Sequence, residues 1–162
     1  MKTTELEFIV KFYGERTAKR SGVPLINHIH EGLAVLNHIK ASDLAKRAYC
    51  LHPLIQADND LISNVQLMEL FDGRVVALAM EYRRVANAYL SFRQIKSINE
   101  IELSPLKDVN DMLIADKVQN RKDFNLYHLG KHERSEALDQ YFKNWFQRLG
   151  IDESYMVVTG TY

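Results

Sequence analysis

The sequence has few of the residues that form disulfides or interrupt helices, and it has no long apolar segment. Cys50 is the only cysteine among 162 residues, which excludes an internal disulfide, and its apolar surroundings predict a buried core residue. There are only three prolines, and no repeat or Gly/Ser-rich linker occurs. No segment approaches the roughly 20 apolar residues of a membrane span, and the start MKTTELEF lacks the apolar core of a secretory signal. We therefore expect a cytoplasmic protein without a membrane partner.

An excess of charge of either sign is also missing. Lys and Arg together number 21, as do Asp and Glu, so the formal net charge is zero. Proteins that bind nucleic acids in general rely on many cations to neutralise phosphates, which argues against a nucleic-acid partner. A small phosphorylated ligand stays compatible with this balance, because a pocket needs only a few local cations.

Apolar residues instead recur at helical spacing along nearly the whole chain. We expect helices around residues 6–13, 25–39, 43–52, 58–71, 74–92, 105–124 and 138–149. Ser42 is a plausible cap for the third of them, Pro105 opens the sixth at its first turn, and Gly150 ends the last. Residues 94–104 read as an ambiguous stretch or a loop, and the tail YMVVTGTY is β-prone with an open role. The prediction is an all-α fold, a single helical bundle over residues 1–162.

Four polar clusters interrupt this pattern. They are Lys19, Arg20, His28 and His30; His52 with Gln56, Asp58 and Asp60; Asp116 with Asn120; and Arg83 with Arg84. Asp116 and Asn120 are one turn apart and share a helix face. By itself each cluster is a weak signal, since a histidine on an apolar helix face is usually a hydrogen-bonded structural residue. The Arg83–Arg84 pair is typical of a solvated face.

The order of three segments resembles the HD-domain superfamily, specifically the hydrolase domain of RelA/SpoT-type enzymes that cleave guanosine tetraphosphate. The segments are KRSGVPLINH, AYCLHPLIQA and IADKVQNRKDF, and the resemblance covers about residues 17–124. It implies an HD-domain-like bundle in which His28, His52 and Asp116 match three of the four family metal ligands. It also implies that Lys19 and Arg20 approach the nucleotide, and that Asp116 and Asn120 contact it.

The sequence departs from that family at the positions that carry metal and water chemistry. Pro53 stands where the family has the Asp that follows the histidine, and the family's Glu-Asp pair falls on Gln56 and Ala57. Loss of a ligand predicts low metal occupancy, and loss of a carboxylate removes a proton acceptor. Pro53 also disfavours a helical backbone at the residue before it, which predicts a changed direction for His52.

Two routes of rescue stay open at this point. Asp58 or Asp60 would swing into the site if the chain after Pro53 takes another path, and His30 would replace a ligand. Together with Gln56, these two carboxylates are the candidates for a catalytic role, which is otherwise unassigned.

The expected function is therefore binding of a phosphorylated purine nucleotide, to sense or sequester it, with weak or no hydrolysis. No cofactor is expected in that case. The alternative is an active nucleotide pyrophosphohydrolase that depends on Mn²⁺ or another divalent cation. A second alternative is a protein-interaction module on the same scaffold, and a homo-oligomer is compatible with all three.

Overall fold

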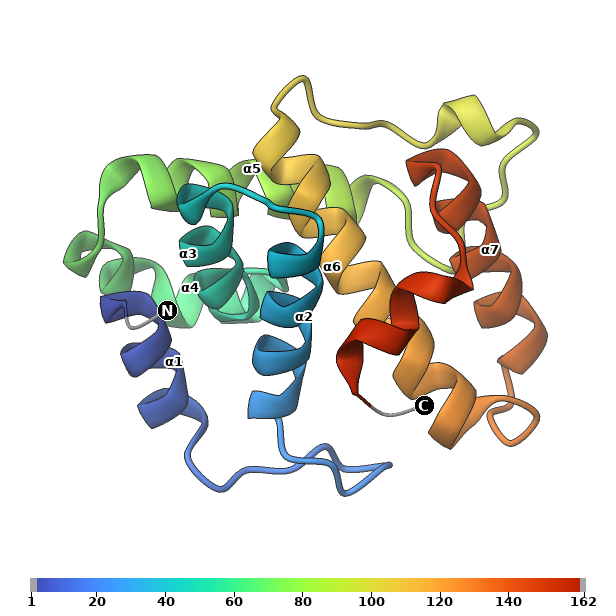
Figure 1. The fold of residues 1–162 in the computed structure, drawn as a ribbon, viewed down its shortest axis with the longest axis horizontal. Helices are drawn as coiled ribbons and strands as arrows, with labels where there is room; N and C mark the ends of the chain where they lie inside the picture. Colours follow the sequence, from blue (N-terminus) through green and yellow to red (C-terminus); the bar gives the residue numbers. More distant parts are fainter. Residues whose placement is uncertain (1–2, 161–162) are drawn as a thin grey trace.

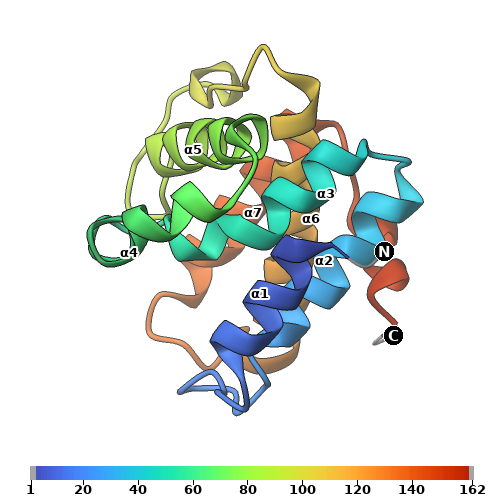
Figure 2. The same cartoon turned by 90° about the vertical axis from the view of Figure 1, so that its left-hand side faces the viewer.

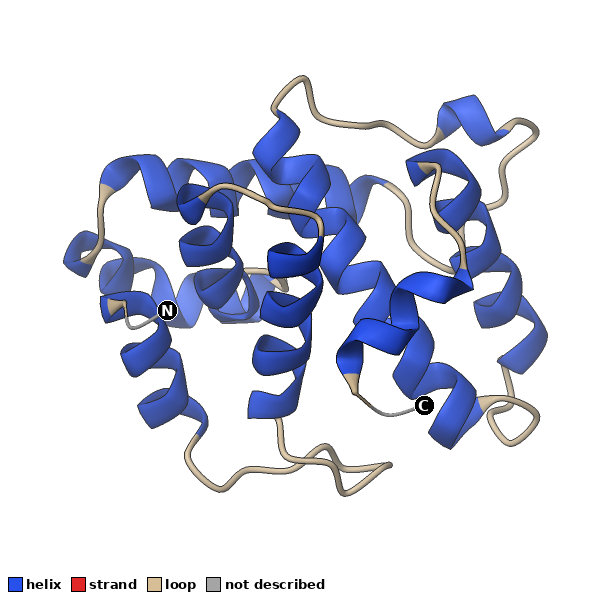
Figure 3. Cartoon of the chain, in the orientation of Figure 1, coloured by secondary structure: helices blue, strands red, loops and turns tan. Residues whose placement is uncertain are grey.

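The computed structural model describes residues 3–160, and it confirms the all-α prediction (Figure 3). The α-helices are α1 (Thr4–Tyr13), α2 (Ile26–His38), α3 (Asp43–Leu51), α4 (Asp58–Asn64), α5 (Gly73–Ala88), α6 (Lys107–Asp123) and α7 (Ser135–Leu149). Shorter turns are the 3₁₀ helices η1 (His52–Leu54), η2 (Val65–Leu70), η3 (Ile98–Glu100) and η5 (Glu153–Thr159), and the π-helix η4 (Phe124–His128). Over the described residues, no helix is both long and apolar enough to cross a membrane.

Helix α6 runs through the middle of the bundle and contacts α2, α3, α5, α7 and η5 (Figure 1). Seen from the side that carries α1, it lies behind α2 and α3 (Figure 2). Buried residues therefore occur all round it, several of them polar or charged. One hydrophobic cluster takes buried side chains from every α-helix except α4, whose Leu61 is partly buried against it, and extends to Met156 in η5. Polar groups on α6 are thus placed inside the core.

The helix ends follow local capping chemistry. The side chain of Ser42 accepts a hydrogen bond of 3.0 Å from the backbone N–H of Ala45, as the sequence predicts. The side chain of Thr3 does the same for Leu6 at 3.2 Å. Gly150 ends α7 in the left-handed conformation, with φ of 69°, which glycine adopts without steric cost. These caps set where α1, α3 and α7 begin or end.

Three sequence-based expectations about local structure are wrong. Residues 58–71 form the short helix α4 followed by a 3₁₀ turn, rather than one helix. Pro105 precedes the cap residue Leu106 and does not occupy the first turn of α6. Residues 155–159 of the β-prone tail lie in the 3₁₀ helix η5, because Met156 is buried where η5 packs on α2 and α6, and the last two residues of the tail lie outside the described residues. Burial in the core outweighs β propensity there.

Gly32 lets α2 and α3 approach closely at the centre of the molecule. A Cβ at this position would lie 2.1 Å from the hydroxyl oxygen of Tyr49, which is fully buried. We expect Gly32→Ala to lower the free energy of unfolding by about 1–3 kcal/mol, because overpacking forces buried groups to move. Urea denaturation followed by circular dichroism measures this.

Gly73 supplies the control for that substitution. It is the first residue of α5, and a Cβ there would meet no atom within 4 Å. Gly73→Ala should leave the unfolding free energy unchanged or slightly raised. Equal effects of the two substitutions would show that Tyr49 moves aside at no cost.

Candidate metal centre

Three residues that are far apart in the sequence converge in the core. His28 lies in the first turn of α2, His52 follows the last residue of α3, and Asp116 lies in the middle of α6. The Nε2 atoms of the two histidines are 3.0 Å apart. Oδ1 of Asp116 lies 3.5 Å from Nε2 of His28 and 3.7 Å from Nε2 of His52. His52 and Asp116 are buried, whereas 22% of the His28 side chain is exposed. Solvent therefore reaches the cluster at His28.

The other ring nitrogen of each histidine has its own acceptor. Nδ1 of His52 donates to the carbonyl oxygen of Tyr49 at 2.6 Å. Nδ1 of His28 lies 2.6 Å from Oε1 of Gln119 and donates to it. A neutral imidazole that donates through Nδ1 presents an unprotonated Nε2. The two Nε2 atoms and one carboxylate oxygen face one another, and with both imidazoles neutral this is the arrangement that surrounds a metal ion.

The charge of Asp116 is held in place by neighbours on its own helix. Its Oδ2 forms an ion pair of 2.8 Å with Lys117, and Asn120 donates to its Oδ1 at 2.9 Å. Burial by itself would raise the pKa of this carboxyl, but Lys117 and the two imidazoles outweigh burial and hold it below the usual value. Lys117 is itself buried over the rings of Tyr141 and Trp145, at 5.6 and 5.2 Å. Asp116 is thus ionised and fixed in direction.

Pro53 does not redirect His52, so that expectation is wrong. The backbone of His52 keeps helical angles, φ −55° and ψ −37°, and its N–H still donates to the carbonyl of Ala48. Pro53 lies at the start of the turn His52–Leu54, where its missing N–H leaves no hydrogen bond unmade. The helix therefore delivers the imidazole into the core. Burial, followed by the nearby His28, lowers the pKa of His52 to about 3, although Asp116 opposes this shift.

A buried polar network supports His28 from behind. Nε2 of Gln119 donates to Glu31 at 3.1 Å and to Asp123 at 2.7 Å, which leaves its oxygen facing the imidazole. Lys122 is buried and pairs with the same two carboxylates, at 2.6 and 2.7 Å. Sequence reasoning missed Gln119, Lys117 and Lys122. One signal in the sequence could have found them. Helix α6 lies in the core, yet it has charged and amide residues on every side, which indicates buried polar contacts.

The catalytic candidates gather elsewhere. Gln56, Asp58 and Asp60 line one cavity of about 660 Å³ beside Pro53, and both aspartates are exposed. Asp58 forms an ion pair with Arg83 there. His52 is 1% exposed and is closed off from that cavity.

His30 lies on the exposed side of α2. Within residues 3–160, the only group of three or more His, Cys, Asp or Glu side chains that converge closely enough to hold a metal is formed by His28, His52 and Asp116. The structure therefore brings neither aspartate nor His30 into the cluster.

The remaining predicted residues have mixed positions. Lys19 and Arg20 are exposed in the loop that leads into α2, the helix carrying His28, and Arg20 contacts His132. Arg84 pairs with Glu81 and Glu102 on the surface, at 2.8 Å in each case, which fits a solvated face. Cys50 is fully buried, and burial raises the pKa of its thiol to about 12, so it packs as an apolar residue.

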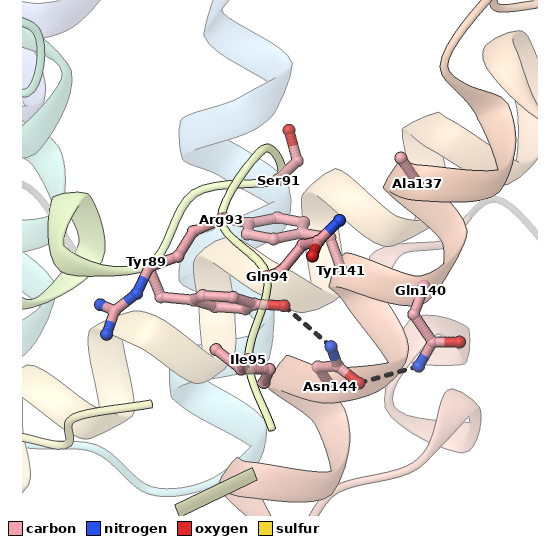
Figure 4. A pocket seen from close by; sticks show the side chains of 9 residues that line it. All are labelled: Tyr89, Ser91, Arg93, Gln94, Ile95, Ala137, Gln140, Tyr141 and Asn144. Atoms are coloured by element: carbon pink, nitrogen blue, oxygen red, sulfur yellow. Dashed lines mark hydrogen bonds between the residues drawn. The ribbon is translucent and has the colours of Figure 1, made fainter. Parts of the chain in front are cut away.

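A second pocket, of about 320 Å³, lies between the segment after α5 and helix α7 (Figure 4). Its floor is aromatic: the rings of Tyr89 and Tyr141 have centroids 5.4 Å apart. Asn144 donates to the hydroxyl of Tyr89 and accepts from Gln140, each at 2.8 Å. None of the predicted site residues lines this pocket. Its residues come from the segment after α5 and from α7, to which the sequence assigns no functional role.

Comparisons of this chain with protein-family models, with curated proteins and with solved structures found no match. The likeness to HD domains stays a prediction, and the functional argument depends on the geometry of the cluster.

Proposed function

We propose that this chain is a metal-binding domain of the HD type that binds a phosphorylated purine nucleotide and hydrolyses it weakly or not at all. One observation supports the proposal above the others. His28, His52 and Asp116 direct two imidazole nitrogens and one carboxylate oxygen at one point, with each histidine oriented by a hydrogen bond on its far side. A buried cluster of acceptors is unfavourable without a cation or a proton among them.

The donor set fits a first-row divalent cation. Two imidazoles and one carboxylate suit ions such as Mn²⁺ or Fe²⁺, whereas an all-oxygen set would favour Mg²⁺ or Ca²⁺. A bound cation of this kind holds a phosphate oxygen and lowers the pKa of bound water. This revises the expectation that no cofactor is used.

We expect weak hydrolysis because no free carboxylate among the described residues is placed in the cluster to act as a general base. A general base within reach is commonly worth about 10²–10⁴-fold in rate. Gln56 has no basic side chain, and its backbone carbonyl accepts from Asn87. Asp58 is held by Arg83 on the surface. Asp116 is the only carboxylate in the group, and a bound cation would use it as a ligand.

The nucleotide part of the proposal is supported by cations at the open side. Lys19 and Arg20 precede α2, whose first turn carries His28, the exposed member of the cluster. Asn120 lies one turn beyond Asp116 on α6 and is partly exposed. Asn120 would offer an amide to a phosphate at the metal, and Lys19 and Arg20 would approach the ligand from their loop, which requires Arg20 to leave its contact with His132.

Titration of the metal-free protein with Mn²⁺, followed by the electron paramagnetic resonance signal of free Mn²⁺, tests the metal site. We expect one equivalent to bind, and His28→Ala to weaken binding by at least about 100-fold, since even loss of a ligand's hydrogen-bond partner costs ~10–100-fold. His30→Ala is the matched control, because this histidine lies two residues away on the exposed face of α2. Its affinity should equal that of the wild type.

Calorimetric titration with guanosine tetraphosphate, with and without Mn²⁺, then tests the ligand. Mn²⁺ should strengthen binding in the wild type and in His30→Ala but not in His28→Ala. Assay of released pyrophosphate separates weak hydrolysis from the alternative of efficient turnover. Absence of stoichiometric Mn²⁺ binding by the wild type would overturn the metal site.

A further inference from the structure

The pocket between the segment after α5 and helix α7 continues along α7 as a groove. A neighbouring hollow, of about 420 Å³, shares Ile95, Gln140 and Asn144 with the pocket of Figure 4. It extends that pocket to Gln147, which lies three residues beyond Asn144 on α7. The two hollows thus form one open groove between α7 and the segment of residues 93–98.

Carboxamide side chains form a row along the α7 wall of this groove. Gln140, Asn144 and Gln147 are spaced by four and then three residues, so they share one face of the helix. Gln94 lines the same groove from the segment after α5. A carboxamide both donates and accepts hydrogen bonds, as a peptide group does. The row can therefore bind the N–H and C=O groups of a peptide backbone.

Internal hydrogen bonds fix the middle of the row and leave its outer atoms unused. Asn144 donates to the hydroxyl of Tyr89 and accepts from Nε2 of Gln140, each at 2.8 Å (Figure 4). Tyr89 is 3% exposed, so it anchors the row to the core. Oε1 of Gln140 accepts no hydrogen bond within residues 3–160, and the side-chain amides of Gln94 and Gln147 have no partner there.

The spacing of the row matches an extended peptide. Four residues of an α-helix rise about 6 Å. In an extended chain, backbone groups that point to the same side repeat every two residues, or about 6.6 Å. Amides one helical turn apart therefore meet successive peptide groups on one side of such a chain. On the opposite wall, the backbone N–H groups of Gln94 and Ile95 donate to no acceptor within the described part of the protein, which adds two donors for backbone carbonyls.

The charge of the groove indicates the chemistry of the peptide. Of the described residues that line it, Arg93 and Lys96 are charged and none has a carboxylate. Glu100 holds this wall in place, because its carboxylate accepts from the backbone N–H groups of Lys96 and Ser97 at 2.9 and 3.0 Å. Phe92 lies between two lining residues in the sequence and is 73% exposed. Two cations and an exposed ring complement an acidic peptide that has an apolar side chain.

We propose that this groove binds an extended, acidic peptide segment of a partner protein. The amides of α7 hydrogen-bond its backbone, Arg93 and Lys96 pair with its carboxylates, and Phe92 packs against one of its apolar side chains. The site does not depend on the metal centre, because His28, His52 and Asp116 do not line the groove.

Selection of random heptapeptides displayed on phage, with the full chain as bait, tests the proposal. Asp and Glu should be in excess among the enriched sequences, and the most enriched one is then synthesised with capped ends and titrated. Gln140→Ala and Gln147→Ala should each weaken its binding about fivefold, because each removes a hydrogen bond to the peptide. Both residues are exposed, so neither substitution disturbs the core. Gln66→Ala is the matched control: it removes the same amide from an exposed position in η2, outside the groove, and should bind as the wild type does.

Two further measurements separate recognition of the backbone from attraction by charge. N-methylation of alternate peptide bonds in the same peptide removes the donors on one side of its backbone, and one of the two N-methylated forms should bind the wild type at least about tenfold more weakly. Lys96→Ala should weaken binding of the unmodified peptide about tenfold, whereas Lys131→Ala, which removes the same charge from an exposed position before α7, should not.

Failure to enrich acidic sequences would overturn the proposal, as would equal binding by Gln140→Ala, Lys96→Ala and the wild type. Unchanged binding of both N-methylated forms would show that the groove does not recognise a peptide backbone, and would overturn it as well.

Discussion

Replacing Asp116 by alanine is expected to lower the free energy of unfolding by about 3–5 kcal/mol, even in metal-free protein. The side chains of Asp116 and Lys117 are 2% and 4% exposed, so the substitution leaves an ammonium group in the core without its counter-charge. Breaking a buried pair on one side costs about this much, because the remaining charge stays desolvated. Urea denaturation in EDTA measures it.

The same helix provides a control for this prediction. Asp111 pairs with Lys107 at 2.6 Å, but Lys107 is 77% exposed and returns to water when its partner is removed. Asp111→Ala should therefore cost at most about 1 kcal/mol. The double substitution Asp116→Ala with Lys117→Met should recover much of the lost stability, since an apolar chain suits the rings of Tyr141 and Trp145. A loss no larger than that of Asp111→Ala would mean that Lys117 finds another partner.

Acid should destabilise the metal-free protein well above the pH at which carboxylates titrate. The folded protein holds the pKa of His52 at about 3, mainly through burial, whereas an unfolded histidine titrates near 6.5. Between these values the unfolded chain binds one more proton, so the unfolding free energy falls by about 1.4 kcal/mol per pH unit as the pH drops. From pH 6.5 to 4.5 the loss is about 2 kcal/mol, because half of the unfolded histidines are already protonated at pH 6.5. Urea denaturation at several pH values in EDTA gives the slope.

The carboxyl of Asp116 acts in the same direction at lower pH. Its folded pKa is depressed, so its stabilising contribution is present above the unfolded value near 4 and is lost as the pH falls further. His52→Asn separates the two groups, because the amide can still donate toward the carbonyl of Tyr49 but does not titrate. Its stability curve should be flatter than that of the wild type between pH 6.5 and 4.5. Parallel curves would contradict a neutral His52.

The periodicity of apolar residues is sufficient to predict the positions of most helices, because helix formation and capping depend on residues close together in the sequence. The spacing of Ile26, Ile29, Leu33 and Leu36 predicts a helix over 25–39, and α2 spans Ile26–His38. The hydroxyl of Ser42 predicts the start of α3 for the same reason. Where a distant partner decides, local signals fail: η5 is helical because Met156 packs on α2 and α6, which lie far away in sequence.

The candidate site also has a part that the sequence predicts and a part that depends on contacts between distant elements. The quoted segments include His28, His52 and Asp116, and the structure brings these together. Neither the support of His28 by Gln119 nor the position of Lys117 over Trp145 could be predicted, because each joins elements far apart in the chain. The effect of Pro53 was misjudged, since a general backbone preference does not reveal that the next turn is a 3₁₀ helix, which accommodates proline.

The π-helical turn after α6 sets how the segment beyond it is oriented relative to the proposed metal centre. In η4 the N–H of Leu129 donates to the carbonyl of Phe124, five residues earlier, so this turn holds one residue more than an α-helical turn. Removing one residue here would restore the α period and rotate everything that follows by about 100°. His128 and Lys131 would swing away from Arg20, whereas Asp116 and Asn120, which come earlier, would keep their places. A single inserted residue thus sets the angular position of the segment after Phe124 relative to the metal centre.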